Sequence, residues 1–327
     1  MVNGSELVRT NGEPSSHEER LSPQEVRKST REIFSNYAWR SNAILHPMVE
    51  EGQGRFSLGS VPGRPDEEQL QVDAMGEPIL ANLIRDAHLP AFVFGEHNYH
   101  DYSDGDPKVG FTIDPFDNSG EFARGLDTPP YSVLGAYRPD GSPIGAVVVD
   151  IKGQKAFVSI KKVNSVIDLS TIDMNHQELE AVRPKKNSVK DENGIVIASY
   201  VGEREYSRKY YSAFGLMEDE WSGKSRHYGN GGAFVYAYLA TGAVDAYIMF
   251  DEPHSEILPG LPLALAAGCV ASSIDLETGD TRDYRFDPDF IINPDRYTHG
   301  TVDLFIAARS SELRDEIIGY YLRRRKD

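Results

Sequence analysis

Short apolar runs alternate with helical patterns along most of this chain, and that alternation limits the folds it can adopt. The runs at residues 91–94 and 109–113 are apolar throughout, which is typical of strands buried inside a sheet. The runs at 132–137 and 144–151 flank a Pro-Asp-Gly turn and predict a β-hairpin. Because helical patterns precede and follow these strands, we expect a layered α+β architecture with mixed sheets between helices.

The remaining elements are predicted from the same periodicities. Ser22 can cap a first helix that starts at Pro23 and reaches about Ile44, with Glu25 completing a capping box. Gly242 can end a later helix in the left-handed conformation. We predict helices at 69–88, 207–215, 233–240, 262–267 and 311–324, strands at 155–161, 194–200, 243–250, 269–276 and 301–309, a loop or short hairpin at 52–68, and irregular surface loops at 164–193.

The organisation along the chain suggests a tail and two parts. Residues 1–20 are polar with almost no large apolar side chains, so we expect a disordered tail. Residues 21–160 are expected to form an N-terminal α+β part that carries the chemistry. Residues 161–327 are expected to form a C-terminal α/β part that contributes the substrate pocket.

Charge and composition exclude several kinds of partner. The formal net charge of −17 opposes binding to nucleic acids and to anionic membranes, both of which need clustered basic residues. No apolar run approaches the roughly 20 residues of a membrane span. Without a recognisable secretory signal, and with Cys269 as its single cysteine, the chain is expected to be soluble and cytoplasmic, with Cys269 an inert core residue. A nucleotide-binding phosphate loop is not expected either, because the glycine-rich segment 229–232 lacks the lysine and the strand context.

The sharpest local signal lies where an apolar strand meets a proline. Asp114-Pro115-Phe116-Asp117 places two carboxylates three residues apart, and Asn118 and Ser119 follow with further polar groups. Pro115 cannot donate a hydrogen bond in a central strand, so we expect a tight turn that aims both carboxylates at one point. Oxygen ligands converging in this way suit a hard cation, with a phosphate held between the metal and backbone N–H groups.

This segment resembles the D-P-x-D-G-T signature of the inositol monophosphatase and fructose-1,6-bisphosphatase superfamily. Upstream, Gly95-Glu96 is similar to the G-E-E element, and Asp73 with Glu77 resembles the family's T-x-x-D-x-x-x-E helix start. Downstream, residues 239–247 resemble the family's helix, glycine and D-A-Y block. The resemblance runs in order from about Gln69 to the C-terminal helix. It implies an α/β/α/β layered sugar-phosphatase fold.

The chain also departs from the family pattern. Aligning residues 263–268 with the W-D-x-A-A-G landmark would put alanine at a ligand position, whereas another register places Glu256 there. We prefer Glu256. Asn118 and Ser119 replace the signature Gly and Thr, and His97 stands where a second Glu is usual. These changes alter the phosphate-binding turn and the surroundings of the metal-bound water.

The resemblance implies magnesium-dependent hydrolysis of a phosphate monoester on a small polyol, sugar or nucleotide, by water that two metals activate. It assigns Glu96, Asp114, Asp117 and Glu256 as ligands of two Mg²⁺ ions, for which Mn²⁺ is a possible substitute. Asp73 is assigned to a weaker third ion. Ile113 and Phe116, which are neighbours of the two aspartates in the chain, are assigned to the metal site as well. Ser119 is expected to orient the water. Asn118, Ser119, Arg226, Asn230 and Glu256 are expected to contact the substrate, and a homodimer is expected.

Two other functions stay open at this point. The same metal and phosphate site could serve an enzyme that eliminates phosphate or forms a ring, and release of phosphate without incorporation of water would distinguish it. Alternatively, the chain could be a catalytically weak protein that binds phosphorylated ligands. In that case magnesium and ligand would raise its thermal stability, yet no monoester would be hydrolysed.

Overall fold

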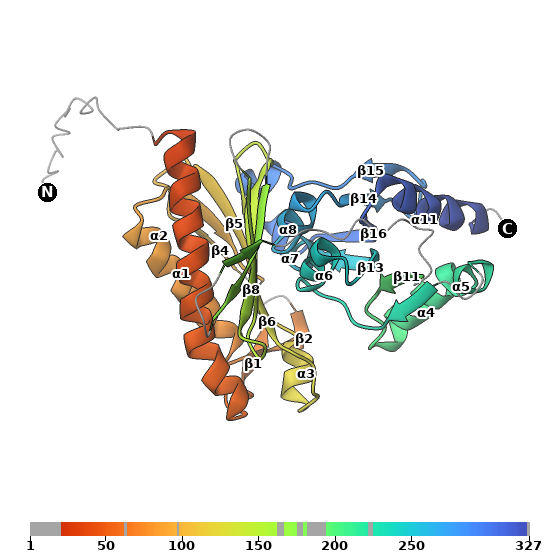
Figure 1. Cartoon of the computed structure of the whole chain (residues 1–327), viewed down its shortest axis with the longest axis horizontal. Helices are drawn as coiled ribbons and strands as arrows, with labels where there is room; N and C mark the ends of the chain where they lie inside the picture. The colour runs from red at the N-terminus through yellow and green to blue at the C-terminus, as the bar shows by residue number, and fades with distance from the viewer. Residues whose placement is uncertain are drawn as a thin grey trace, which may run out of the picture.

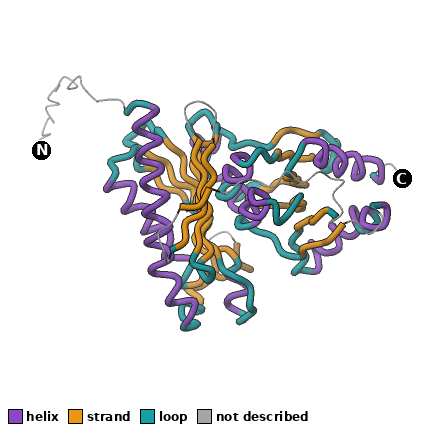
Figure 2. The backbone as a smooth tube through the Cα atoms, viewed as in Figure 1, coloured by secondary structure: helices purple, strands orange, loops and turns teal. Residues whose placement is uncertain are grey.

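The computed structural model describes residues 21–61, 64–96, 98–161, 167–174, 179–181, 194–221 and 225–325. Two mixed sheets lie in this part of the chain, with helices outside and between them (Figure 1, Figure 2). The predictions for the 1–20 tail and for His97 fall outside the described residues. None of the described helices has the length and apolar character of a bilayer-spanning segment.

The first sheet has eight strands in the order β10-β9-β8-β7-β6-β5-β3-β4. Their bounds are β3 Ala91–Phe94, β4 Tyr99–Asp101, β5 Val109–Asp117, β6 Tyr131–Tyr137, β7 Pro143–Asp150, β8 Lys155–Lys161, β9 Ile167–Asp173 and β10 Leu179–Ala181. Only β3 and β5 pair in parallel; the other neighbours are antiparallel. The sheet is therefore mixed, and β6 with β7 forms the predicted hairpin.

Two helices cover the outer face of this sheet, α1 (Pro23–Glu50) and α2 (Asp73–Asp86) (Figure 1). The Ser22 hydroxyl accepts the backbone N–H of Glu25, and the Glu25 carboxylate accepts the N–H of Ser22, so the predicted capping box is confirmed. The helix continues beyond the predicted end at Ile44. Buried side chains such as Phe34 and Phe111, whose rings meet edge to face, join α1 to the sheet.

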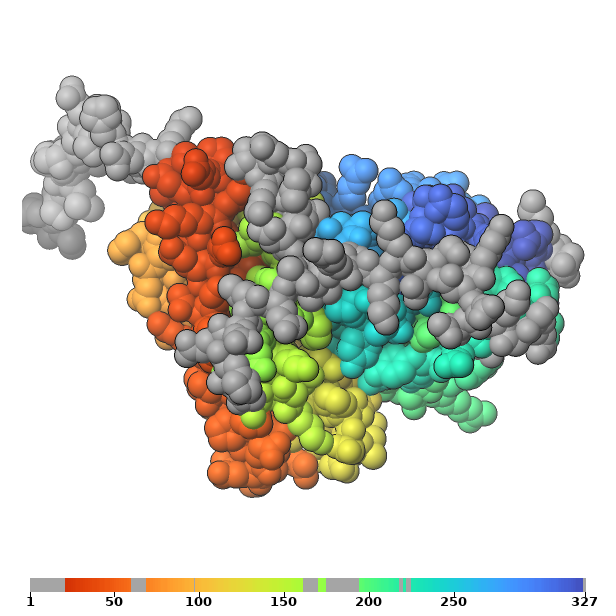
Figure 3. Space-filling view, viewed as in Figure 1, coloured from red at the N-terminus to blue at the C-terminus, as the bar shows by residue number. Residues whose placement is uncertain are grey.

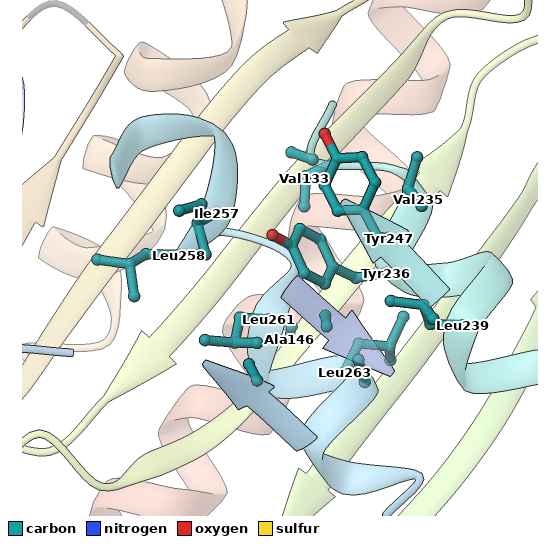
Figure 4. Packing of buried hydrophobic residues seen from close by; sticks show 14 of the residues in the cluster. Val133, Ala146, Val235, Tyr236, Leu239, Tyr247, Ile257, Leu258, Leu261 and Leu263 are labelled. Atoms are coloured by element: carbon teal, nitrogen blue, oxygen red, sulfur yellow. The ribbon is translucent and has the colours of Figure 1, made fainter. Parts of the chain in front are cut away.

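The layer between the two sheets consists of three short helices, α6 (Val235–Thr241), α7 (His254–Ile257) and α8 (Leu261–Ala266). Figure 4 shows their apolar side chains with those of β6, β7 and β13 in one interior. Gly242 ends α6 at φ 78°, as its expected left-handed cap requires. Cys269 is buried in the same core, as predicted. This layer holds both sheets together.

The second sheet has six strands in the order β12-β11-β13-β16-β14-β15. Their bounds are β11 Ile195–Ala198, β12 Ser225–Tyr228, β13 Ala246–Pro253, β14 Val270–Ile274, β15 Thr281–Asp283 and β16 Thr301–Ala308. Its outer face packs against α4 (Arg204–Phe214) and α11 (Ser311–Arg324). The expected α/β/α/β order is thus present and is followed by one more helical layer. The remaining short elements are β1 Ser57–Val61, β2 Arg64–Leu70, α3 Ser119–Ala123, α5 Met217–Glu220, α9 Asp289–Ile292 and α10 Asp295–Thr298.

The prediction of irregular loops at 164–193 is wrong for two segments. Ile167–Asp173 pairs with β8 along its whole length, and Leu179–Ala181 pairs with β9, so the first sheet extends past residue 161. In the space-filling view, the yellow-green strands of the first sheet lie beside the teal segment of the central helical layer (Figure 3), and α8 of that layer contacts β7 and β8.

Candidate metal centre

An irregularity in β5 places two aspartates on the same side of the first sheet. Asp114 pairs with Val133 and Asp117 with Tyr131, so three steps along β5 match two steps along β6. In a regular strand, residues three apart point to opposite faces; one extra residue cancels that alternation. Pro115 lies within this bulge, where a missing N–H costs no ladder hydrogen bond. The predicted turn after Ile113 is therefore a bulge within a strand that continues to Asp117.

The backbone beyond Asp117 turns through a left-handed residue. Asn118 has φ 69°, and its side-chain amide donates to the carbonyl oxygen of Pro129 at 3.1 Å. Asn tolerates this conformation better than most residues, which explains how it can replace the signature glycine. The chain then enters α3 at Ser119. Asn230 donates to the Asn118 side chain at 3.3 Å, so two predicted substrate residues lie side by side.

Glu256 completes a cluster with the two aspartates. It lies on α7, just after the end of β13, and one oxygen from each of Asp114, Asp117 and Glu256 lies within 4.8 Å of the others. We call these three residues the acidic cluster. Ala264, which the rival register would have placed at the ligand position, is fully buried in the central core. The geometry thus favours the register that selected Glu256.

Backbone contacts hold Asp117 in place. Its Oδ2 atom accepts the N–H of Phe234 at 2.7 Å. Gly232, at φ 133°, packs so closely that a Cβ atom there would be 2.4 Å from Asp117 Oδ1. The glycine-rich segment before α6 therefore makes room for a carboxylate of the acidic cluster, a role that its sequence alone did not indicate.

Two more predicted residues lie at the same site. Glu96, which follows β3, lines the same cleft as Asp117 and Glu256, and its charge raises the pKa of Asp114. Asp73, at the start of α2, accepts the N–H of Leu70 at 2.6 Å through Oδ2. Its other oxygen, Oδ1, is buried and has no hydrogen-bond partner in the described part of the chain.

Burial and mutual repulsion disfavour the charged forms of these carboxylates. Burial, followed by the charges of Asp117 and Glu256, raises the pKa of Asp114 well above its usual range. Burial and Glu256 do the same for Asp117. Burial raises the pKa of Asp73 to about 7. Such a group of carboxylates is stable in the charged form only when cations offset the repulsion.

Asp117 and Glu256 of the acidic cluster line a cleft of about 600 Å³. The cleft is lined by Leu70, Asp73, Glu96, Asp117, Asn118, Ser119, Gly120, Glu121, Ala123, Arg124, Tyr200, Glu203, Tyr206, Gly231, Gly232, Tyr247, Met249, Glu252, Pro253 and Glu256. These residues come from β2, β5 and β13, from α2, α3, α4 and α7, and from loops next to these elements. A volume of this size fits a small phosphorylated molecule.

Comparison with known proteins identifies the family. Residues 57–312 match the sequence pattern of the inositol monophosphatase family. The chain belongs to this family. No curated protein matches the sequence. This match confirms the resemblance noted in the sequence. The family is one of metal-dependent phosphatases.

Solved structures of inositol monophosphatases share this fold at low sequence identity. The Thermotoga maritima enzyme has a TM-score of 0.62 at 15% identity, with 91% of this chain and 98% of that chain covered. The Anabaena enzyme has a TM-score of 0.60 at 16% identity, with coverage of 90% and 96%. A Staphylococcus aureus enzyme bound to inositol monophosphate has a TM-score of 0.58 at 15% identity, with coverage of 91% and 93%.

The donor set of this inositol monophosphatase family member fits magnesium. Carboxylate oxygens are the ligands that Mg²⁺ takes from proteins, usually one or two carboxylates together with substrate phosphate. The unpartnered Asp73 Oδ1 offers one more such oxygen at the cleft. The residues present therefore fit the metal that the family uses.

Several predicted residues have other surroundings. Ile113 and Phe116 are buried, with Phe116 packed on Phe122, so only their backbone carbonyls could bind a metal. Arg226 is exposed on β12 and is not among the residues that line the cleft. Its contact with substrate stays a prediction. Ser119 lines the cleft, and its role toward the water stays a prediction as well.

Sequence reasoning missed Glu252 and Tyr247. Glu252 lines the cleft at 3% exposure, and burial together with the charge of Glu256 raises its pKa well above the usual range. The Tyr247 hydroxyl accepts the N–H of Gly232 at 2.9 Å and donates to Glu252 Oε1 at 2.8 Å. Glu252 stands in an ordinary Asp-Glu-Pro strand end, so no spacing in the sequence marked it.

Proposed function

We propose that this protein hydrolyses a phosphate monoester on a small polyol, sugar or nucleotide with the help of Mg²⁺. The observation that carries the proposal is the acidic cluster: one oxygen from each of its three carboxylates lies within 4.8 Å of the others, and Asp117 and Glu256 line a cleft of about 600 Å³. Family membership supports the same reaction class. Two ions would be held by Glu96 and the acidic cluster, and Asp73 could hold a weaker third.

The side chains divide the work of the reaction between them. Bound magnesium would supply Lewis acidity to the phosphoryl group and lower the pKa of the attacking water. The Ser119 hydroxyl would orient that water. Asn118 and Asn230 would contact the polar end of the substrate, and the Phe234 N–H holds Asp117 in the orientation the cation needs. Positioning and charge neutralisation account for most catalysis of phosphoryl transfer, so no protein nucleophile is required.

A phosphate-release assay tests the proposal. A broad panel of phosphate monoesters is incubated with the protein and Mg²⁺, and in parallel with the protein and EDTA. The water in both reactions is labelled with a heavy oxygen isotope. We expect Mg²⁺-dependent phosphate that carries one labelled oxygen, and the Asp114→Asn variant should lose at least about 100-fold of the rate. The matched control is Asp127→Asn, an exposed aspartate paired with Lys152. No release from any ester would contradict hydrolysis, and unlabelled phosphate would favour elimination or cyclisation.

The cytoplasmic location and the homodimer stay predictions.

A further inference from the structure

Beyond the metal centre, two tyrosines and two glutamates form one wall of the cleft. We call Glu121, Tyr200, Glu203 and Tyr206 the outer wall; all four line the cleft that Asp117 and Glu256 also line. Glu121 lies on α3, and the other three lie between the end of β11 and the first turn of α4. The ring centroids of Tyr200 and Tyr206 are 5.8 Å apart with an interplanar angle of 63°.

The Tyr200 part of the outer wall is fixed before any ligand binds. Its backbone N–H donates to the sulfur of Met249 at 3.0 Å. Gly202 packs so near the Tyr200 ring that a Cβ atom would lie 2.9 Å from it. A preorganised aromatic surface loses little conformational entropy when a ligand binds to it.

The outer wall has an excess of negative charge. In the part of the chain that the structure describes, neither Glu121 nor Glu203 forms an ion pair, and Arg124 is the one basic side chain that lines the cleft. Burial, then the charges of Glu121 and Glu203, raise the pKa of Tyr200 to about 12, and the smaller effect of Arg124 lowers it. Glu203 therefore acts on both tyrosines, and Glu121 acts on Tyr200.

We propose that the outer wall binds a protonated or quaternary amine of the substrate, so that the preferred phosphomonoesters also carry a positive charge. Tyrosine ring faces attract cations, and carboxylates form charge-assisted hydrogen bonds with ammonium groups. A second phosphate or a carboxylate in this position would be repelled by Glu121 and Glu203. The inference rests on the proposed function, because it assumes that the phosphate end lies at the acidic cluster.

The cleft also shows a need for a ligand that is independent of the outer wall. Asp73 is 5% exposed and lines the cleft, yet its Oδ1 atom has no hydrogen-bond partner among the residues that the structure describes. Buried polar atoms are almost always satisfied in native proteins, so this oxygen indicates that a cation completes the metal centre, where the proposal places the phosphate end.

Matched pairs of esters test the proposal. Ethanolamine phosphate is compared with ethylene glycol phosphate, and phosphocholine with its neutral tert-butyl isostere. With Mg²⁺ at neutral pH, we expect the charged member of each pair to have a kcat/KM about 10-fold higher. The affinities of the same esters are measured by calorimetric titration into the protein with Ca²⁺ in place of Mg²⁺, so that the measurement does not depend on turnover. The charged and neutral members of each pair should differ in affinity by a similar ratio. Equal values, or a preference for the neutral member, would overturn the inference.

Substitution of one wall carboxylate tests which residues make the distinction. Glu203→Gln keeps the size of the side chain and removes its charge, so the ratio between charged and neutral esters should fall at least about threefold. The control is Glu205→Gln, two residues further along, where Glu205 pairs with Lys209 at 3.0 Å and does not line the cleft. An unchanged ratio in Glu203→Gln would contradict the assignment.

The two proposals fail in distinguishable ways. If phosphate is released from both members of each pair at the same rate and both bind equally, the amine site is wrong and hydrolysis stands. If no ester is hydrolysed but the charged members bind about 10-fold more tightly, the amine site stands and hydrolysis is wrong.

Discussion

Gly232 is a residue whose lack of a side chain matters directly to the metal centre. A Cβ atom there would lie 2.4 Å from Asp117 Oδ1, and the backbone is at φ 133°. We expect Gly232→Ala to displace the Asp117 carboxylate and to weaken Mg²⁺ binding at least about 10-fold, because ligand geometry for Mg²⁺ is strict. The affinity is measured by calorimetric titration.

The matched control for this substitution is Gly319→Ala on α11. There a new Cβ would meet nothing closer than the end of the Arg323 side chain at 3.4 Å, and the residue is helical. Its Mg²⁺ affinity should equal that of the unmodified protein. Wild-type affinity in Gly232→Ala would show that the close packing on Asp117 does not matter.

Tyr247 links the glycine-rich segment to a buried carboxylate. Removing its hydroxyl in Tyr247→Phe leaves Glu252 Oε1 and the Gly232 N–H without this partner. We expect the free energy of unfolding, measured in urea, to fall by about 1–3 kcal/mol. Tyr211→Phe is the control, because Tyr211 is half exposed and its hydroxyl lies 3.4 Å from His227. An equal loss in both variants would contradict a special role for the Tyr247 hydrogen bonds.

At the scale of elements, the carboxylates that α2, β5 and α7 bring together make the stability of the protein depend on pH and on metal. The folded-state pKa of Asp73 is raised from 3.8 to about 7, and those of Asp114 and Asp117 are raised too. At a pH between the unfolded-state and folded-state pKa values of these carboxylates, the folded state binds more protons than the unfolded state. The contribution of these carboxylates to the stability of the metal-free protein therefore falls as pH rises from about 4 to about 7. Partly buried His254, whose pKa is lowered to about 4, contributes with the opposite sign.

Magnesium should reverse this loss, because it binds the charged carboxylates. In thermal denaturation at neutral pH, we expect Mg²⁺ to raise the Tm of the EDTA-treated protein by several degrees, and by much less near pH 4.5, where protons compete. A Mg²⁺ effect that does not depend on pH would contradict this explanation.

Much of the element pattern could be predicted because local signals were strong. The capping box at Ser22 and the left-handed Gly242 specify helix ends through nearby residues alone. The bulge in β5 was predicted only as a turn, since its form depends on pairing with β6. The strand at Ile167–Asp173 was missed because its apolar residues are few, and pairing with β8 over its whole length decides its structure.

The site was predictable to the extent that its residues follow one another in a motif. Asp114 and Asp117 were recognisable from the Asp-Pro-Phe-Asp motif, and Glu256 from the register that the family resemblance supplied. Glu252 was not, because its position at the cleft arises from a contact with Tyr247 and from the packing of β13 against the central layer. Tertiary proximity of this kind leaves no trace in a single sequence.

At the scale of the whole molecule, the central helical layer carries the connection between the two sheets and so the shape of the cleft. Leu263 on α8 is fully buried in the core between the sheets (Figure 4). We expect Leu263→Ala to lower the free energy of unfolding by about 2–5 kcal/mol, measured in urea. Leu126→Ala, at a half-exposed position, should change it by less than about 0.5 kcal/mol. A small effect at Leu263 would mean that the central layer is not a tightly packed core.

The central claim is that the acidic cluster gathers divalent cations next to a bound phosphate. Crystals soaked with Mn²⁺ and inorganic phosphate test it through the anomalous scattering of manganese. The account predicts manganese bound by oxygens of Asp114, Asp117 and Glu256, with phosphate on the cleft side. A crystal with no manganese at these carboxylates, at a concentration that saturates Mn²⁺-dependent stabilisation, would contradict it.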